Sequence, residues 1–193
     1  MCSSDLNLMA LAEHRLGAAK GSRNAVCLTL GTGVGGGIII AGRLYRGSSF
    51  AAGEIGHMPI NEKGPRCNCG GIACLERYIG NRYILKRAKK AFGSDITLEA
   101  LTKLAKGGNN KAISIWTDVA EKLGIALTGV VNLLNPDKII IGGGVGKAVE
   151  FIIVPLKKTI KERAMKGHAK HIKISMAKLG PDAGIIGASL LLR

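Results

Sequence analysis

Aromatic and acidic residues are both scarce in this chain of 193 residues. Phe, Trp and Tyr make up 4% of the sequence, which leaves no evident platform on which nucleic-acid bases could stack. The chain has 13 acidic and 28 basic residues, so its formal net charge is +15 at pH 7. A basic surface also suits nucleic acid, but without stacking rings we interpret the excess as solvated helix faces and expect no nucleic-acid partner.

Long apolar runs are missing as well. The longest, such as 139–141 and 185–186, are too short to span a bilayer, and the N-terminus lacks the basic and apolar segments of a signal peptide. The five cysteines are an odd number, and three of them crowd one loop, which favours metal ligation in a reducing compartment over a disulfide framework. We therefore predict a cytoplasmic protein without a membrane partner.

Hydrophobic residues, in contrast, make up 47% of the chain, enough for one domain with a sizeable core. Runs of apolar residues predict strands, at 25–30, 38–41, 44–46, 138–141 and 172–177. Apolar residues at helical spacing predict helices, at 7–20, 75–92, 111–134, 147–165 and 183–191, and Thr97 is typical of the N-cap of a further short helix. Strands come first and then alternate with helices, which predicts an α/β fold with a mixed sheet.

A Cys₃His set is the most specific pattern in the sequence. His57, Cys67, Cys69 and Cys74 lie close together in a Gly-rich loop, and such a set is one of the closed tetrahedral combinations that bind structural Zn²⁺. Four protein ligands leave no open position, which argues against a metal-activated water. The alternative is a loop with chance cysteines and a core or sugar-binding histidine. We expect the metal to order the loop rather than the whole fold.

Two glycine runs are candidates for nucleotide binding. The segment 28–37 predicts an antiparallel hairpin with a turn at 31–37, whose unhindered amides could hold phosphate or could simply form the turn. The segment 139–146 combines a strand with a glycine turn before a helix, which suits close approach of a nucleotide. The first run is not followed by the Gly-Lys-Ser/Thr of a Walker loop, and the second lacks the G-x-G-x-x-G pattern and the later acidic residue of a dinucleotide site.

Carboxylates near the cysteine loop are candidates for binding hydroxyl groups. Glu54, His57 and Glu76 could accept or donate hydrogen bonds to a sugar, although solvated surface side chains are the alternative. Asp5, followed by Asn7, could act as a general base for a sugar hydroxyl, although an ordinary helix N-cap is the alternative.

Taken together, these segments resemble the ROK family (repressors, open reading frames and sugar kinases). The resemblance rests on Leu-Thr-Leu-Gly-Thr-Gly-Val-Gly-Gly-Gly, Ala-Gly-Glu-Ile-Gly-His, Cys-x-Cys-Gly-Gly-Ile-Ala-Cys-Leu-Glu and Ile-Ile-Gly-Gly-Gly, in the family's order and spacing from about Asn7 to Arg193. It implies an actin-like ATPase, or ribonuclease H-like, fold of the hexokinase type. It also implies two lobes, of which this chain resembles the C-terminal one with its zinc loop; the D-x-G-x-T phosphate loop of the other lobe does not occur here.

The resemblance also implies roles for residues. Asp5 matches the catalytic aspartate and Asn7 its neighbour, with Ser4 in place of the family's first Asn. Substrate contacts fall on Asn7, Glu54, His57 and Glu76, nucleotide contacts on Gly31, Thr32, Gly33, Gly143 and Gly144, and metal ligands on His57, Cys67, Cys69 and Cys74. Ala73 replaces a family glycine, which should not prevent ligation. The implied cofactors are structural Zn²⁺ and ATP with Mg²⁺, the implied substrate is a hexose, and the implied assembly is a homodimer.

The first six residues, Met-Cys-Ser-Ser-Asp-Leu, match the translation of a common sequencing-adapter end. We therefore predict that residues 1–6 are an artefact and that the C-terminal lobe occupies 7–193. On this interpretation Asp5 stands at the catalytic position by coincidence.

We predict that the full-length protein phosphorylates a hexose with ATP, as a glucokinase does, and that this chain alone has little activity. The alternative is a sugar-responsive repressor of the same family without its N-terminal DNA-binding module. A metal-binding interaction module without sugar is a third interpretation.

Overall fold

The computed structural model describes residues 3–144 and 148–192. Its strands form one five-stranded sheet in the order β3-β2-β1-β4-β5. Their bounds are β1 Ala25–Leu30, β2 Val34–Ile40, β3 Arg43–Tyr45, β4 Lys138–Gly142 and β5 Lys173–Met176. β1 pairs antiparallel with β2 and parallel with β4, and β4 pairs parallel with β5, so the prediction of a mixed sheet is confirmed.

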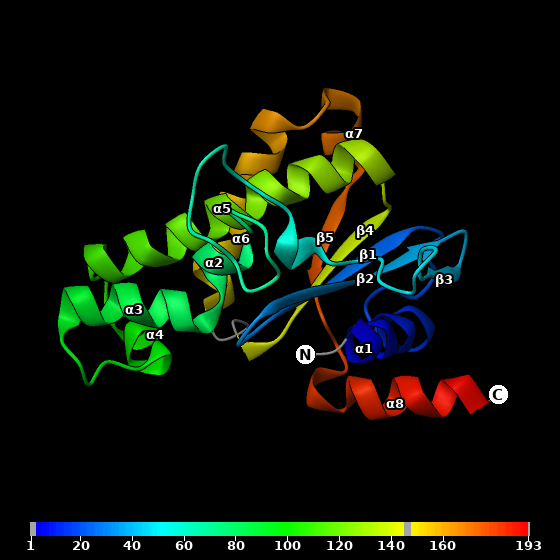
Figure 1. The fold of residues 1–193 in the computed structure, drawn as a ribbon, viewed down its shortest axis with the longest axis horizontal. Coiled ribbons are helices and arrows are strands. Elements are labelled where there is room, and N and C mark those ends of the chain that lie inside the picture. Colours follow the sequence, from blue (N-terminus) through cyan, green and yellow to red (C-terminus); the bar gives the residue numbers. More distant parts are fainter. Residues whose placement is uncertain (1–2, 145–147, 193) are drawn as a thin grey trace.

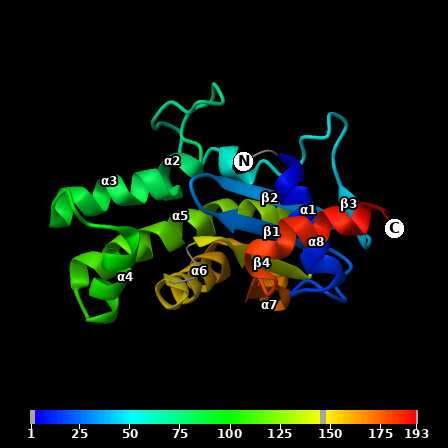
Figure 2. The ribbon, with the colours of Figure 1, turned by 90° about the horizontal axis from the view of Figure 1, so that it is seen from below.

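Helices cover both faces of this sheet (Figure 1). One face packs against α1 (Ser3–Arg15) and α8 (Ala183–Ser189), and the other against α5 (Asn110–Leu134) and α6 (Val149–Arg163) (Figure 2). The remaining helices are α2 Glu76–Ile79, α3 Asn81–Phe92, α4 Leu98–Lys106 and α7 Lys166–His171, with 3-10 turns η1 Ile55–His57, η3 Gly180–Asp182 and η4 Leu190–Leu192. In the described ranges, no helix has both the length and the apolar character needed to cross a membrane.

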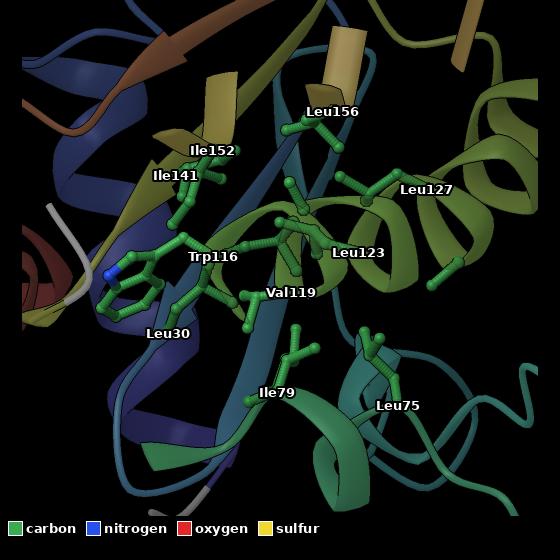
Figure 3. Close-up of a cluster of buried hydrophobic side chains, with 14 of the residues drawn as sticks. Leu30, Leu75, Ile79, Trp116, Val119, Leu123, Leu127, Ile141, Ile152 and Leu156 are labelled. Atoms are coloured by element: carbon green, nitrogen blue, oxygen red, sulfur yellow. The ribbon is translucent and has the colours of Figure 1, made fainter. Parts of the chain in front are cut away.

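The alternation of side chains along β1 gives the protein two cores. Leu28 and Leu30 point into the larger core under α5 and α6, whereas Cys27 points into a smaller core under α1 and α8. Trp116 of α5 lies at one edge of the larger core beside Leu30 and is 1% exposed (Figure 3).

The hairpin differs from its prediction because β2 begins at Val34 rather than at Ile38. The turn is therefore limited to 31–33, and three glycines belong to the strand. A Cβ on Gly35 would lie 1.9 Å from the Leu6 side chain, and one on Gly36 would lie 2.7 Å from the carbonyl oxygen of Gly53. These glycines thus allow α1 and the loop before η1 to approach opposite faces of β2. The sequence predicted that they form a turn, whereas in the structure their small size permits this packing.

Two predicted helices also differ from the observed ones. The helix predicted at 75–92 is divided at Gly80, whose extended backbone ends α2 before α3 starts at Asn81. The amide of Asn81 donates instead to the carbonyl of Gly31, at 2.9 Å, so the break ties α3 to the β1–β2 turn. The helix predicted at 7–20 ends at Arg15, and α7 was not predicted at all.

Candidate functional site

Loop backbone contacts bring the predicted metal ligands together. His57 is the last residue of η1, and Gly53, just before η1, packs against β2. Cys67 and Cys74 belong to the loop that follows η1, and this loop folds back onto Met58. The amide of Cys67 donates to the carbonyl of Gly71 at 2.8 Å, and the amide of Leu75 donates to Met58 at 2.9 Å. Ala73 is fully buried with a φ of 55°, the left-handed conformation that favours the glycine found at this place in the family pattern.

The geometry of the four ligand atoms fits a tetrahedral metal ion. These atoms, from His57, Cys67, Cys69 and Cys74, all lie within 4.8 Å of one another. The Sγ atoms of Cys69 and Cys74 are 3.7 Å apart, and Sγ of Cys67 is 3.6 Å from Nδ1 of His57. Ligands at zinc–sulfur and zinc–nitrogen bond lengths on a tetrahedron would be separated by about 3.8 Å and about 3.6 Å. These two pairs therefore have tetrahedral separations, and all four atoms lie close enough to converge on one ion.

The pKa values of Cys69 and Cys74 are shifted in opposite directions. Burial is the main cause that raises the pKa of Cys74 to about 12, and hydrogen bonds with Cys69 and Cys67 add to it. The pKa of the exposed Cys69 is lowered, chiefly by a hydrogen bond from the backbone of Gly71, although some desolvation opposes this. A coordinated dication deprotonates its thiol ligands, so metal binding would release a proton from Cys74.

Glu54 lies on the other side of the His57 ring. Its Oε2 is 4.0 Å from Nε2 of His57, while Nδ1 of the same ring faces Cys67. With Nδ1 on a metal, Nε2 carries the ring proton and can donate a hydrogen bond. The side chains of His57 and Glu54 are 33% and 42% exposed, so both remain open to a ligand.

Glu76 does not lie free at the surface but supports the β1–β2 turn. Its Oε2 accepts a hydrogen bond from the amide of Val34 at 2.9 Å. A Cβ on Gly33 would lie 2.6 Å from the same oxygen, so a side chain at this position would push the carboxylate away from the turn. The structure thus joins a predicted substrate residue to the predicted nucleotide residues 31–33.

A cavity of about 720 Å³ brings together Asp5 and the second glycine run. Asp5, at the exposed start of α1, lines this cavity with Thr29, Gly143 and Gly144, near the carboxyl ends of β1 and β4. Asn7 is 8% exposed, and its Oδ1 is buried without a hydrogen-bond partner among the described residues. Leu6, which follows Asp5, and Gly53, which precedes Glu54, pack on opposite faces of β2, at Gly35 and Gly36.

A second cavity, of about 220 Å³, was not foreseen from the sequence. Gly144 lines it together with Asn81, Thr102 and Trp116, so this glycine borders both cavities. Nε1 of Trp116 and Oδ1 of Asn81 are buried polar atoms without a hydrogen-bond partner in the described part of the chain. Figure 3 shows the indole nitrogen pointing away from the labelled leucines. No sequence pattern marks these two residues, because a helix stripe explains Trp116 equally well.

Comparisons with known proteins agree on one family. The ROK family model matches residues 1–193. The chain is 37% identical to a glucokinase of Halalkalibacterium halodurans, over 98% of this chain and 62% of the glucokinase. A ROK family glucokinase from Streptomyces griseus, solved in complex with glucose and AMPPNP, superposes with a TM-score of 0.87 at 32% identity, over 97% of this chain and 66% of that one.

A regulator superposes equally well. The structure of a ROK family transcriptional regulator, a homologue of the Escherichia coli MLC protein, gives a TM-score of 0.88 at 28% identity, over 97% of this chain and 50% of the regulator. The chain thus spans about half to two thirds of the lengths of these relatives. The predicted actin-like ATPase fold is confirmed, and the fold is common to kinases and regulators.

Proposed function

Because the chain belongs to the ROK family, as its motifs predicted, we propose that it is the C-terminal lobe of an ATP-dependent hexose kinase of the glucokinase type. We propose that the lobe spans residues 7–193 and that a second lobe closes over the sugar in the full-length protein. On its own, the chain is expected to bind ligands and to turn over slowly.

The observation that carries this proposal is the meeting of two glycine turns at one end of the sheet. β1 and β4 are parallel neighbours, with Thr29 opposite Gly142, so the segments that follow them emerge side by side. Gly143 has a φ of 95°, and a Cβ on it would lie 2.2 Å from the carbonyl oxygen of Leu30. Only glycine permits this contact, and we infer that amides of the two turns other than that of Gly31, which donates to Gly33 at 3.0 Å, bind phosphate groups.

The two cavities suit the two ends of ATP. We place the phosphates in the larger cavity beside Thr29 and Gly143, and the adenine in the smaller cavity beyond Gly144. The unpaired Nε1–H of Trp116 is a donor and the unpaired Oδ1 of Asn81 is an acceptor, and a nucleobase edge offers partners for both. Binding would thus satisfy two buried polar atoms that otherwise cost free energy.

In the proposed reaction of the full-length protein, a carboxylate at the position that Asp5 occupies here, at the start of α1, accepts the proton of a sugar hydroxyl. The hydroxyl oxygen forms a bond to the γ-phosphorus as the bond to the bridging oxygen breaks, and ADP leaves. Mg²⁺ bound with ATP would supply neutralisation of the phosphate charge. The remaining contribution of the chain is positioning, with Glu54, His57 and Glu76 orienting the sugar.

We assign the Cys₃His cluster to structural Zn²⁺ that orients His57. Its closed ligand set supports a positioning role rather than hydrolysis of water. With Nδ1 held by the metal, Nε2–H of His57 and the carboxylate of Glu54 form a donor and an acceptor side by side, which matches a sugar hydroxyl.

Gly144→Val is the variant that tests nucleotide binding. A Cβ at this position meets no described atom within 4 Å, so the added side chain can occupy the cavity space without disturbing the fold. We expect AMPPNP affinity, measured by calorimetry, to fall at least about 10-fold while glucose affinity is unchanged. Gly167→Val, in α7, is the control, because this glycine is equally open and lies far from the turns. Equal nucleotide affinity in both variants would exclude our placement of ATP.

Glu54→Gln tests the sugar site. The substitution keeps the size of the side chain but removes a charged acceptor, so glucose affinity is expected to fall about 10- to 100-fold. Zinc content should not change, because Glu54 is not a ligand of the cluster. Glu62→Gln, at an exposed position of the same loop, is the matched control and should bind glucose as the parent does. If both variants bind glucose equally well, Glu54 is not a sugar ligand.

A sugar-responsive repressor is the second candidate, because the chain superposes on a ROK regulator as closely as on a glucokinase. The two functions differ in their need for nucleotide. Glucose binding without any measurable binding of AMPPNP would favour the repressor, whereas binding of both ligands favours the kinase.

A further inference from the structure

A basic groove lies at the opposite end of the sheet from the glycine turns. It is lined by α6, α7 and the segment that enters β5, and it has a volume of about 590 Å³. Ile174 pairs with Ile139 near the start of the parallel strands, whereas the glycine turns follow the strand ends. Figure 1 shows α7 on the side of the molecule away from α1 and α8. The groove therefore belongs to neither of the ligand cavities described above.

Four lysines form the rim of this groove. Lys157 and Lys161 are one helical turn apart on α6, and Lys166 and Lys170 are one turn apart on α7. All four are exposed, and none forms an ion pair within the described ranges. No acidic residue lines the groove, and the nearby Glu162 pairs with Lys158 at 3.9 Å. The rim is thus a concentrated and uncompensated positive charge.

The floor of the groove is apolar. It contains Ile160 of α6 together with Ala169, Ile172 and Ile174, the last three of which are only partly buried. A partner that offered only negative charge would leave the apolar floor exposed to water. No aromatic side chain lines the groove, so a nucleic-acid base would have nothing on which to stack. The floor therefore favours a ligand that combines acidic groups with apolar anchors.

We propose that this groove, between α6 and α7, binds an acidic amphipathic helix of a partner protein. Apolar side chains of that helix would enter between the two lysine pairs, and its carboxylates would meet the lysines at the rim. Complementary charges of this kind give specific binding and fast association, and added salt weakens the attraction between them. The binding surface is independent of the sugar and nucleotide sites and could couple the protein to a regulatory partner.

The test uses a fluorescein-labelled helical peptide with glutamates on one face and leucines at i, i+3, i+4 and i+7. We expect micromolar binding to the chain by fluorescence anisotropy, and weaker binding by at least about 10-fold for a peptide of the same composition in scrambled order. Tighter binding of a 20-base-pair DNA duplex, or equal binding of the scrambled peptide, would show an unspecific basic surface and overturn the proposal.

Matched charge reversals locate the site. Lys157→Glu, Lys161→Glu, Lys166→Glu and Lys170→Glu, combined in one variant, are expected to weaken peptide binding at least about 30-fold. The control combines Lys86→Glu, Lys89→Glu, Lys90→Glu and Lys111→Glu, which reverse the same amount of charge at exposed positions of α3 and α5. An equal loss in both variants, with equal circular dichroism, would mean that only net charge matters.

Ala169→Arg distinguishes binding in the apolar groove from attraction by positive charge alone. This substitution adds a positive charge but fills the apolar floor between the lysines. If attraction by charge alone explained binding, the variant would bind the acidic peptide more tightly; our proposal requires weaker binding. Sedimentation of the parent chain completes the test, since a self-association abolished by the four groove substitutions would assign the groove to a second copy instead.

Discussion

Replacing Glu13 with alanine is expected to destabilise the protein by about 3 to 5 kcal/mol, because three backbone amides in partly buried hydrogen bonds would lose their acceptor. Glu13 is 0% exposed. Its Oε2 accepts from the amide of Ala18 at 2.7 Å, and its Oε1 accepts from the amides of Lys178 and Leu179, both at 2.8 Å. One carboxylate thus accepts a hydrogen bond just after the C-terminal end of α1 and also links this helix, by two hydrogen bonds, to the segment between β5 and η3.

The consequence of this loss extends to the candidate site. The segment after β5 lines the larger cavity through Ala177 and Gly180, and α1 contributes Asp5 to the same cavity. Since small domains are stable by roughly 5 to 15 kcal/mol, the variant is expected to be partly unfolded at 37 °C.

Urea denaturation followed by circular dichroism measures this effect. Glu13→Gln is the informative control, because it keeps one oxygen acceptor and turns the other oxygen into a donor, so an intermediate loss is expected. Gly17→Ala should also destabilise, since its Cβ would lie 2.1 Å from Oε2 of Glu13. A midpoint for Glu13→Ala close to that of the parent would show that water replaces the carboxylate without cost.

Glu13 also makes contacts that could not be predicted from the sequence. An acidic residue in the middle of a predicted helix is typical of a solvated surface, and nothing local indicates that amides 165 and 166 residues later need it as an acceptor. The same holds for the glycines of β2, whose small size serves contacts with α1 and with the loop before η1. Such long-range contacts depend on packing that a periodicity of apolar residues does not contain.

Periodicity predicted most strands and helices well where burial alone decides. β1 was predicted at its observed bounds and α5 within one residue at its start, because one is buried on both faces and the other has a long apolar stripe. α7 was missed because Lys166–His171 contains no apolar stripe and none of its residues is fully buried. The division at Gly80 was missed because it depends on a hydrogen bond to Gly31.

Some residues of the candidate site could likewise be predicted from the sequence, and others could not. The four candidate metal ligands follow from spacing within one loop, since thiols and an imidazole so close in sequence can converge locally. The second cavity could not be predicted, because Trp116 and Asn81 become notable only when folding leaves their polar atoms unpaired beside Gly144.

Replacing Cys69 with serine is expected to reduce bound zinc from about one ion per chain to nearly none, because a hydroxyl is a poor substitute for a thiolate ligand. Elemental analysis of the purified protein measures this directly. Cys69 is the most suitable ligand to change, since it is exposed whereas Cys67 and Cys74 are buried, so the substitution opens no cavity. Cys27→Ala is the control; its thiol is buried in the smaller core, outside the cluster, and zinc should remain.

Glucose affinity of the Cys69→Ser variant is expected to fall about 10- to 100-fold, since His57 loses the contact that fixes its ring. The sheet and its two cores do not include Cys69, so the circular dichroism spectrum should be retained, unlike that of Glu13→Ala. Loss of zinc with unchanged glucose affinity would separate the metal from the sugar site. Zinc retained by the variant would show that the remaining three ligands suffice. The first result would contradict the proposal that the metal orients His57 toward the substrate, whereas the second would contradict only the need for a fourth protein ligand.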